Sequence, residues 1–190
     1  MFREERNYAH FLQLYYRHLF PKAETYAYCL LKNHFHLLIY LKTDEEIVRD
    51  IKPDRSDNGL PTRISSDLSG LGHVEHLLTR PPSQAFSNLF NAYTKSFNIA
   101  YDRTGALFER PFRRIEVYTP AYFHKLVIYI HQNPQQHGFV DDFRDWKYSS
   151  YRALVSDKET RLSRSKLLKQ FDGVAGFLEL HNALIDLDFE

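Results

Sequence analysis

The amino-acid sequence predicts an α+β fold. Its best-defined feature is the stretch from Glu24 to Leu41, where two apolar strands flank a short polar turn at Lys32-Asn33. Amphipathic helices are expected on both sides of this hairpin, because apolar residues recur at helical spacing in residues 7–19 and 82–100. The chain has 190 residues, 43% of them hydrophobic, which suits one domain or one domain with a long appendage.

Composition narrows the class of protein. The net charge is +1, so any surface that binds nucleic acid must arise from local segregation of charge. Cys29 is the single cysteine, which excludes an internal disulfide and fits a reducing compartment. The sequence shows no apolar run long enough to cross a bilayer and no leader peptide. We therefore expect a soluble, cytoplasmic protein with no membrane partner.

The elements before residue 82 follow from periodicity and capping. The helix over residues 7–19 should end before Pro21, which cannot continue it. Thr43 stands before three acidic residues, a pattern typical of a helix start. Residues 52–72 are rich in proline, glycine and small polar residues and predict a loop.

The second strand of the hairpin carries two histidines. His34 and His36 should share one face, because residues i and i+2 of a strand point the same way. The opposite face is entirely apolar and is expected to be fully buried; it consists of Phe35, Leu37, Ile39 and Leu41. The pattern indicates a core strand that carries a site.

The second half of the chain is predicted to be mostly helical. Helix 82–100 should bury a stripe made of Phe86, Leu89, Tyr93 and Phe97. A further helix should begin with the cap Thr119-Pro120 and end at Asn133-Pro134. The other expected segments are a strand at 115–118, an irregular stretch at 135–146, a short helix at 147–154 and, after a charged linker, helices at 163–171 and 174–183.

A second constellation lies on the helix after Thr119. Tyr129 and Asn133 are four residues apart and share a helix face, so a hydroxyl and an amide oxygen can converge on one point. Ordinary structural roles remain open for all of these residues. The histidines can be polar residues on a half-solvated sheet face, Tyr129 a core aromatic and Asn133 a helix terminator.

Two strings of residues resemble a known family. Residues 26–39 (YAYCLLKNHFHLLI) and 129–138 (YIHQNPQQHG) are similar to the signatures of the HUH single-tyrosine transposases, in the branch of the REP-associated tyrosine transposases. Residues 103–108, 110–113 and 146–151 resemble the arginine-rich and tryptophan–serine segments of that branch. The resemblance covers roughly residues 1–155. It predicts a catalytic domain over 1–155 and a helical C-terminal extension over 156–190.

The resemblance implies a ferredoxin-like antiparallel sheet with helices on one face. It also implies a metal-dependent nuclease and strand transferase that nicks and rejoins single-stranded or hairpin DNA. His34 and His36 match the histidines that hold one divalent cation, Mg²⁺ or Mn²⁺, and Asn133 matches the amide that completes the metal site. Tyr129 matches the nucleophile.

This chemistry agrees with the residue types. A cation held by two imidazoles and an amide oxygen keeps open positions for the scissile phosphate. Tyrosine has a pKa of about 10 and needs help from the cation to ionise. Attack by Tyr129 would leave a phosphotyrosine on the 5′ side and a free 3′ hydroxyl. Rejoining would then need no ATP.

Basic residues are assigned to the DNA. The candidates for phosphate contacts are Lys95, Arg103, Arg110, Arg113 and Arg114, and Phe108 and Phe112 are candidates for stacking on unpaired bases. The alternative is that the arginines pair with Asp102, Glu109 and Glu116 and that the phenylalanines belong to the core. His124, His131 and His137 are assigned structural or DNA-facing roles.

The sequence departs from the family pattern at its start. Relatives begin with a further strand, whereas Met1-Phe2-Arg3 stands where the turn after that strand is expected. The resemblance thus predicts a sheet without its first strand. Either the chain is truncated relative to these relatives, which leaves open whether the enzyme is active, or a partner or the C-terminal extension fills the gap. Two alternatives to an enzyme follow: a domesticated, non-catalytic DNA-binding protein, and a protein whose histidines hold a structural zinc. A homodimer, with each tyrosine helix serving the partner's histidines, is also left open.

Overall fold

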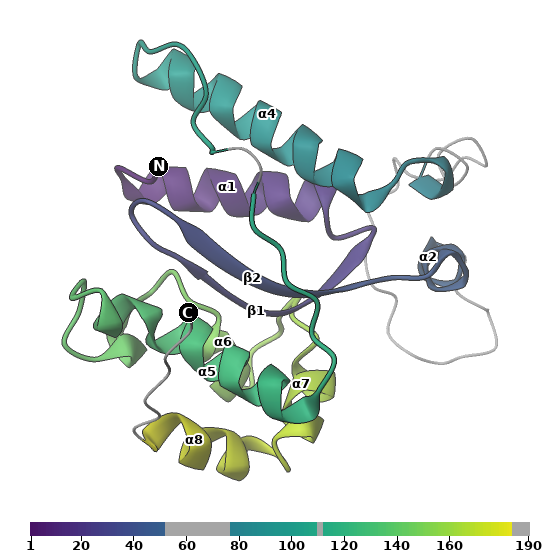
Figure 1. The fold of residues 1–190 in the computed structure, drawn as a ribbon, viewed down its shortest axis with the longest axis vertical. Coiled ribbons are helices and arrows are strands. Elements are labelled where there is room, and N and C mark those ends of the chain that lie inside the picture. The colour runs from purple at the N-terminus through teal and green to yellow at the C-terminus, as the bar shows by residue number, and fades with distance from the viewer. Residues whose placement is uncertain (52–76, 110–111, 184–190) are drawn as a thin grey trace. The chain divides into compact units, whose positions relative to one another are not determined.

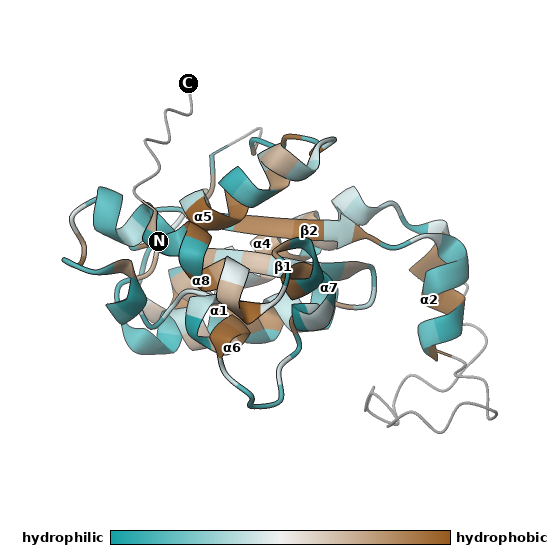
Figure 2. Cartoon of the chain, turned by 90° about the horizontal axis from the view of Figure 1, so that it is seen from below, coloured by the Kyte–Doolittle hydropathy of each residue, from teal (hydrophilic) through white to brown (hydrophobic). Residues whose placement is uncertain are grey.

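A computed structural model describes residues 1–51, 77–109 and 112–183 (Figure 1). It confirms an α+β fold, with a two-stranded antiparallel sheet made of β1 (Ala23–Leu30) and β2 (Phe35–Leu41). Much of both strands is hydrophobic (Figure 2). The helices of the described part are α1 (Glu5–His18), α2 (Asp44–Ile51), α4 (Pro82–Ala100), α5 (Pro120–Gln136), a 3-10 turn (Phe143–Asp145), α6 (Tyr151–Val155), α7 (Arg164–Gln170) and α8 (Val174–Asn182). The ferredoxin-like arrangement stays a prediction.

The chain forms two compact units. Unit 1 comprises Met1–Tyr8, Glu24–Tyr40 and Glu109–Glu190, and unit 2 comprises Ala9–Ala23 and Leu41–Phe108. None of the helices in the described ranges is long and apolar enough to cross a bilayer.

The core of unit 1 joins the sheet to the C-terminal helices. Ala27 and Cys29 of β1 are fully buried and belong to the same cluster as Val127 and Ile130 of α5. In Figure 1 the helices α5 to α8 lie on one side of the two strands. The same cluster includes Leu162, Leu167, Phe171 and Phe177. The segment after residue 155 therefore shares this core, and the domain boundary at that residue stays a prediction.

The outer edge of β1 is covered by segments from the C-terminal half. The N–H of Leu30 donates to the carbonyl of Tyr148 at 3.0 Å, and the N–H of Ser150 donates to the carbonyl of Tyr28 at 2.9 Å. Farther along, the N–H of Ser163 donates to the carbonyl of Thr25 at 2.9 Å. These bonds satisfy polar groups that an open sheet edge would leave unpaired.

Unit 2 is held together by aromatic contacts. Phe11 of α1 packs edge-on against Tyr93 of α4, with ring centroids 5.3 Å apart. Leu89, Tyr93 and Phe97 are buried as the periodicity predicts. Phe86 is only half-buried, and Ala85 takes the buried position at that end of the stripe.

Several predicted caps and bounds are confirmed. Thr43 and Glu46 form a reciprocal capping box at α2, at 2.9 and 3.3 Å. Thr119 caps α5 by accepting from the N–H of Tyr122 at 3.2 Å. The predicted loop over residues 52–72 lies outside the described residues.

The predicted strand at 115–118 is wrong. Residues 112–119 form no ladder, and Tyr118 is 79% exposed. A strand requires a neighbouring strand to pair its backbone, and among the described residues this segment has none. The short helix predicted at 147–154 begins only at Tyr151, because the backbones of Tyr148 and Ser150 are bonded to β1 instead.

The predicted end of α5 at Asn133-Pro134 is also wrong. The helix continues through Pro134 to Gln136. In the last turn, proline removes one intrahelical bond, and the carbonyls of Asn133 and Pro134 still accept from the N–H groups of His137 and Phe139.

The apolar face of β2 is less buried than predicted. Phe35, Leu37 and Ile39 are half-buried, and Leu41 is 46% exposed. Leu38, on the same face as His36, is buried in the unit 1 core. The histidine face is therefore the one that packs against this core.

A buried chain of hydrogen bonds ties β1, α5 and α8 together. Nδ1 of His181 lies 2.7 Å from the carbonyl of Phe177, to which it must donate. Its Nε2 therefore accepts from Nδ1 of His131 at 2.8 Å, and Nε2 of His131 accepts from the hydroxyl of Ser150 at 2.8 Å. This hydroxyl in turn accepts from the N–H of Tyr28 at 2.9 Å. The two histidines thus serve as neutral structural groups.

We expect stability to fall at mildly acidic pH because of this chain. Burial lowers the pKa of His181 to about 4, against an ordinary value of 6.5. Between these pH values the unfolded state binds more protons than the folded state. The stabilisation that comes from neutral His181 is therefore complete above pH 6.5 and is lost as the pH falls towards 4. The loss between pH 7 and pH 4.5 should be about 2 kcal/mol, measured by urea unfolding at both values. An identical pH dependence in His181→Leu would contradict this assignment.

Candidate functional site

The structure brings four predicted site residues together within unit 1. The ring centroids of His34 and His36 lie 5.1 Å apart. Oδ1 of Asn133 lies 3.3 Å from Nε2 of His34, and the ring centroid of Tyr129 lies 5.4 Å from that of His36. The histidine hairpin and α5 of a single chain therefore form one cluster.

Local contacts hold the hairpin end of this cluster. His34 lies in the turn just before β2, and its carbonyl accepts from the N–H of Leu31 at 2.8 Å. Two residues distant in sequence also bind the turn. The N–H of Phe2 donates to the carbonyl of Lys32 at 2.9 Å, and Nε1 of Trp146 donates to the carbonyl of Leu30 at 2.9 Å. The tryptophan thus fixes the histidine turn.

Helix α5 holds the other half of the cluster. Tyr129 is half-buried and Asn133 fully buried, one turn apart on the same face. Between them, His131 is bonded to Ser150 and His181, which fixes the rotation of α5 about its axis. The face that carries Tyr129 and Asn133 is thereby set against the histidine hairpin.

Both site histidines are held in the neutral form. Burial, together with the neighbouring His34 and His137, lowers the pKa of His36 to about 4, and the amide of Asn133 opposes this shift. Burial also lowers the pKa of His34, with the same opposition from Asn133. Neutral imidazole is the form that binds a metal ion, so both rings are ready for ligation at pH 7.

The cluster contains polar atoms that remain unsatisfied. Nδ1 of His34 lies 2.9 Å from Oδ1 of Asn33, and its Nε2 lies 3.3 Å from Oδ1 of Asn133. A neutral imidazole carries one proton, so one of these two contacts joins two acceptors. Nε2 of His36 and Nδ2 of Asn133 are buried without a hydrogen-bond partner. A cation would satisfy the converging lone pairs, and a turned Asn133 amide, which has two N–H donors, is the alternative within the protein.

The donor set fits a divalent cation with open positions. It offers two imidazole nitrogens and one amide oxygen, which suits Mn²⁺ or Mg²⁺ held loosely. In the described part of the chain, no group of three or more His, Cys, Asp or Glu side chains is arranged to hold a metal ion. Cys29 is buried in the core, where burial raises the pKa of its thiol, so it is unsuited to ligate zinc.

His137 is a site neighbour that the sequence did not reveal. Its ring centroid lies 5.1 Å from that of His34, and its side chain is exposed. His137 follows Asn133 by one helical turn. The sequence did not indicate this spacing on one helix, because α5 was expected to end at Asn133. His124, by contrast, binds the carbonyl of Gln170 at 2.6 Å, and His131 is buried, so both are structural.

The predicted DNA-binding residues fall in both units. Lys95 is exposed on α4, and Arg103 is bonded to the carbonyl of Ala106 at 3.2 Å, both in unit 2. Arg113 and Arg114 are exposed in unit 1. Arg110 lies outside the described residues.

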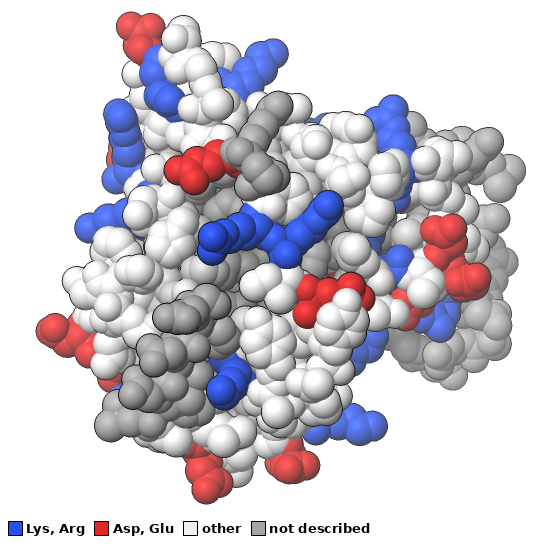
Figure 3. Space-filling view, viewed as in Figure 1, with Lys and Arg blue, Asp and Glu red and all other residues white. Residues whose placement is uncertain are grey.

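The alternative roles of these residues are resolved in part. Phe108 is half-buried and packs against Phe90 within unit 2, with ring centroids 4.6 Å apart. Phe112 is exposed beneath the guanidinium of Arg114, at 5.9 Å. The ion pairs found among the described residues do not include one between these arginines and Asp102, Glu109 or Glu116. Basic and acidic side chains are interspersed on the face shown in Figure 3.

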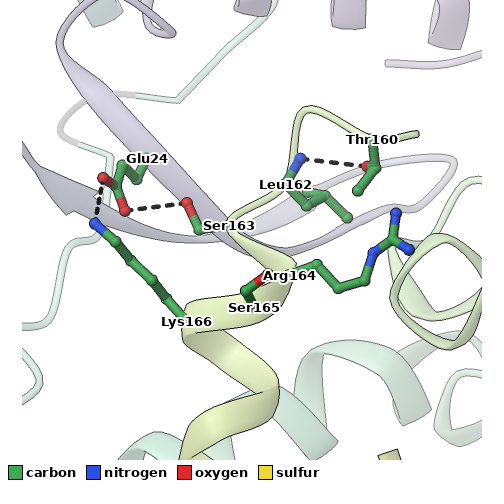
Figure 4. Close-up of a pocket in the computed structure, with 7 residues that line it drawn as sticks. All are labelled: Glu24, Thr160, Leu162, Ser163, Arg164, Ser165 and Lys166. Atoms are coloured by element: carbon green, nitrogen blue, oxygen red, sulfur yellow. Dashed lines mark hydrogen bonds and ion pairs between the residues drawn. The ribbon is translucent and has the colours of Figure 1, made fainter. Parts of the chain in front are cut away.

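A cavity of about 310 Å³ beside α7 contains none of the predicted site residues. Glu24 accepts from Nζ of Lys166 at 2.6 Å and from Oγ of Ser163 at 3.0 Å (Figure 4). The guanidinium of Arg164 binds the carbonyls of Ser156 and Lys158. The charged groups of this cavity are therefore largely engaged with protein partners.

Comparisons of the chain with models of protein families, with curated proteins and with solved structures found no match.

Proposed function

We propose that the protein is a metal-dependent nuclease and strand transferase for single-stranded DNA, of the HUH tyrosine transposase type and related to the REP-associated branch. The observation that supports this proposal is the convergence of two distant stretches of sequence. The histidines come from the hairpin and Tyr129 and Asn133 from α5, and all four residues meet in unit 1. Their residue types match the needs of phosphodiester cleavage.

In this proposal His34, His36 and Asn133 hold one Mg²⁺ or Mn²⁺ ion. When bound, the cation supplies positive charge to the phosphate oxygens and favours ionisation of the tyrosine. Oη of Tyr129 attacks the phosphorus, so a new O–P bond forms while the bond from phosphorus to the 3′ oxygen breaks. The 3′ oxygen takes up a proton, and the 5′ phosphate stays on Tyr129. Attack by another 3′ hydroxyl reverses these steps and rejoins DNA.

The geometry favours a tyrosine that serves the histidines of its own chain. The ring of Tyr129 lies beside that of His36 without a second subunit. The proposed reaction therefore does not require a homodimer.

An exposed segment of unit 1 is the proposed contact for the DNA strand. Phe112, Arg113 and Arg114 lie together on the surface, with the Arg114 guanidinium over the Phe112 ring. An aromatic ring beside basic groups suits an unpaired strand, whose bases stack while its phosphates pair with arginine.

The test is a covalent adduct that depends on a divalent cation. We expect the protein to form an SDS-resistant adduct with hairpin-bearing single-stranded DNA in Mn²⁺ or Mg²⁺ but not in EDTA. His36→Ala should reduce adduct formation about 100-fold or more, because it removes an imidazole ligand. His124→Ala is the matched control, since this histidine contacts the carbonyl of Gln170 and the ring of Phe171 and should leave the adduct unchanged.

Other outcomes would favour the other functions. DNA binding without any adduct would overturn the proposed chemistry and favour the domesticated DNA-binding protein. Tightly held zinc, with neither binding nor cleavage of DNA, would favour a structural metal site instead.

A further inference from the structure

Two buried lysines lie next to each other in unit 2, at the open end of the hairpin. Lys22 is 5% exposed, and the side chain of Lys42 is 8% exposed. The backbone N–H of Lys42 donates to the carbonyl of Lys22 at 3.0 Å, so the two residues are neighbours across the ladder. Like charges in this relation repel each other, and burial makes each ammonium group more costly.

The protein compensates these charges incompletely. Nζ of Lys22 donates to the carbonyls of Leu77 and Arg80. Nζ of Lys42 pairs with Oδ2 of Asp50 at 2.8 Å and donates to the carbonyl of Phe20 at 3.2 Å. Each ammonium has three N–H donors, so each retains a donor beyond these two partners. One carboxylate, Asp50, is bonded directly to the pair.

Both lysines line a cavity of about 350 Å³, a size typical of small ligand sites. Arg80 also lines it, together with Thr43 and Asp44 from the start of α2 and Pro81 from the start of α4. The lining thus contains three cationic side chains and one carboxylate. Pro81, the N-cap of α4, provides no side-chain cap, so the positive end of this helix also lies at the cavity.

We propose that this cavity binds a phosphate group, held by Lys22, Lys42 and Arg80. A phosphate supplies the missing negative charge and accepts the remaining ammonium donors. The group is either free phosphate or the terminal phosphate of a nucleic-acid strand, which share this chemistry. Burial lowers the pKa of Lys22, opposed by the Asp44 carboxylate, and a bound anion would favour its charged form. The site is independent of the histidine cluster and of the proposed nuclease reaction.

The experiment uses the full chain and inorganic phosphate, with chloride at equal ionic strength as the reference. We expect saturable binding by calorimetry and a higher melting temperature in phosphate, because a ligand of the folded state stabilises it. Lys42→Met keeps the aliphatic stem and Arg80→Gln changes an exposed side chain. Each should weaken phosphate binding by about tenfold or more. Lys169→Met, at an exposed position on α7, is the control and should bind as the wild type does.

A second arm distinguishes the source of the phosphate. The same single-stranded oligonucleotide is compared with a 5′ phosphate and with a 5′ hydroxyl, using Tyr129→Phe so that no chemistry intervenes. Tighter binding of the phosphorylated strand that is lost in Arg80→Gln indicates a strand terminus. If the two strands bind equally and inorganic phosphate alone binds in the cavity, the ligand is the free ion. Absence of phosphate binding at about 10 mM, or binding unchanged in both variants, would overturn the proposal.

Discussion

Replacing Tyr129 with phenylalanine should abolish the covalent adduct while leaving the fold intact. The substitution removes one oxygen and keeps the ring, so the edge-on packing against His36 is retained. In the proposed reaction this hydroxyl is the nucleophile, so its removal should reduce cleavage by about 10³-fold or more. The measurement is adduct formation with hairpin DNA in Mn²⁺, accompanied by a thermal melt and a DNA-binding titration of each variant.

The matched control is Tyr122→Phe, which makes the same change at another half-buried tyrosine of α5. Its adduct yield should equal that of the wild type. An adduct that persists in Tyr129→Phe and disappears in Tyr122→Phe would show that Tyr122, and not Tyr129, is the nucleophile. Loss of DNA binding in Tyr129→Phe would instead mean that this side chain contributes to recognition.

Replacing His181 with leucine should cause a large loss of stability. His181 and His131 are both almost completely buried, and each is bonded to the other. Leucine leaves the Nδ1–H of His131 buried without an acceptor, which is more costly than losing the bond alone. We expect the free energy of unfolding to fall by about 2–4 kcal/mol, measured in urea at pH 7.

A double-mutant cycle provides the control. In His131→Leu/His181→Leu the Ser150 hydroxyl can still donate to the carbonyl of Tyr28, 3.2 Å away, so no polar group of the chain is stranded. The double variant should therefore lose less stability than the sum of the two single variants. Strict additivity would contradict a direct hydrogen bond between the histidines. Because His131 lies between Tyr129 and Asn133, the single variants should also form less adduct.

Local signals accounted for much of the fold. The cap at Thr43 and the stripe on α4 depend on short-range spacing; the cap appears as predicted, and the stripe does so except at Phe86. The strand expected at 115–118 failed because strand formation depends on a pairing partner elsewhere in the chain, which local sequence does not specify. The end of α5 was misjudged because proline in a last turn removes a single bond and leaves later carbonyls available.

In the candidate site, the sequence predicted the relations between residues close in the chain and missed those between distant residues. The spacing of His34 and His36 and of Tyr129 and Asn133 placed each pair on one face, since that depends only on strand and helix geometry. His137 was not recognised, because its place beside His34 requires α5 to continue past Pro134. The buried lysine pair gave no sequence signal, because Lys22 and Lys42 are neighbours only through the hairpin ladder.

The sequence by itself determined an α+β chain, its hairpin, the capped starts of α2 and α5, and two pairs of residues suited to the proposed phosphodiester chemistry. These features follow from backbone periodicity and capping, which act over a few residues. Tertiary structure alone decided that the two pairs meet, because α5 packs on the histidine face of the sheet and His131 fixes its rotation. It also decided that burial keeps the site imidazoles neutral, since desolvation depends on everything packed around a side chain.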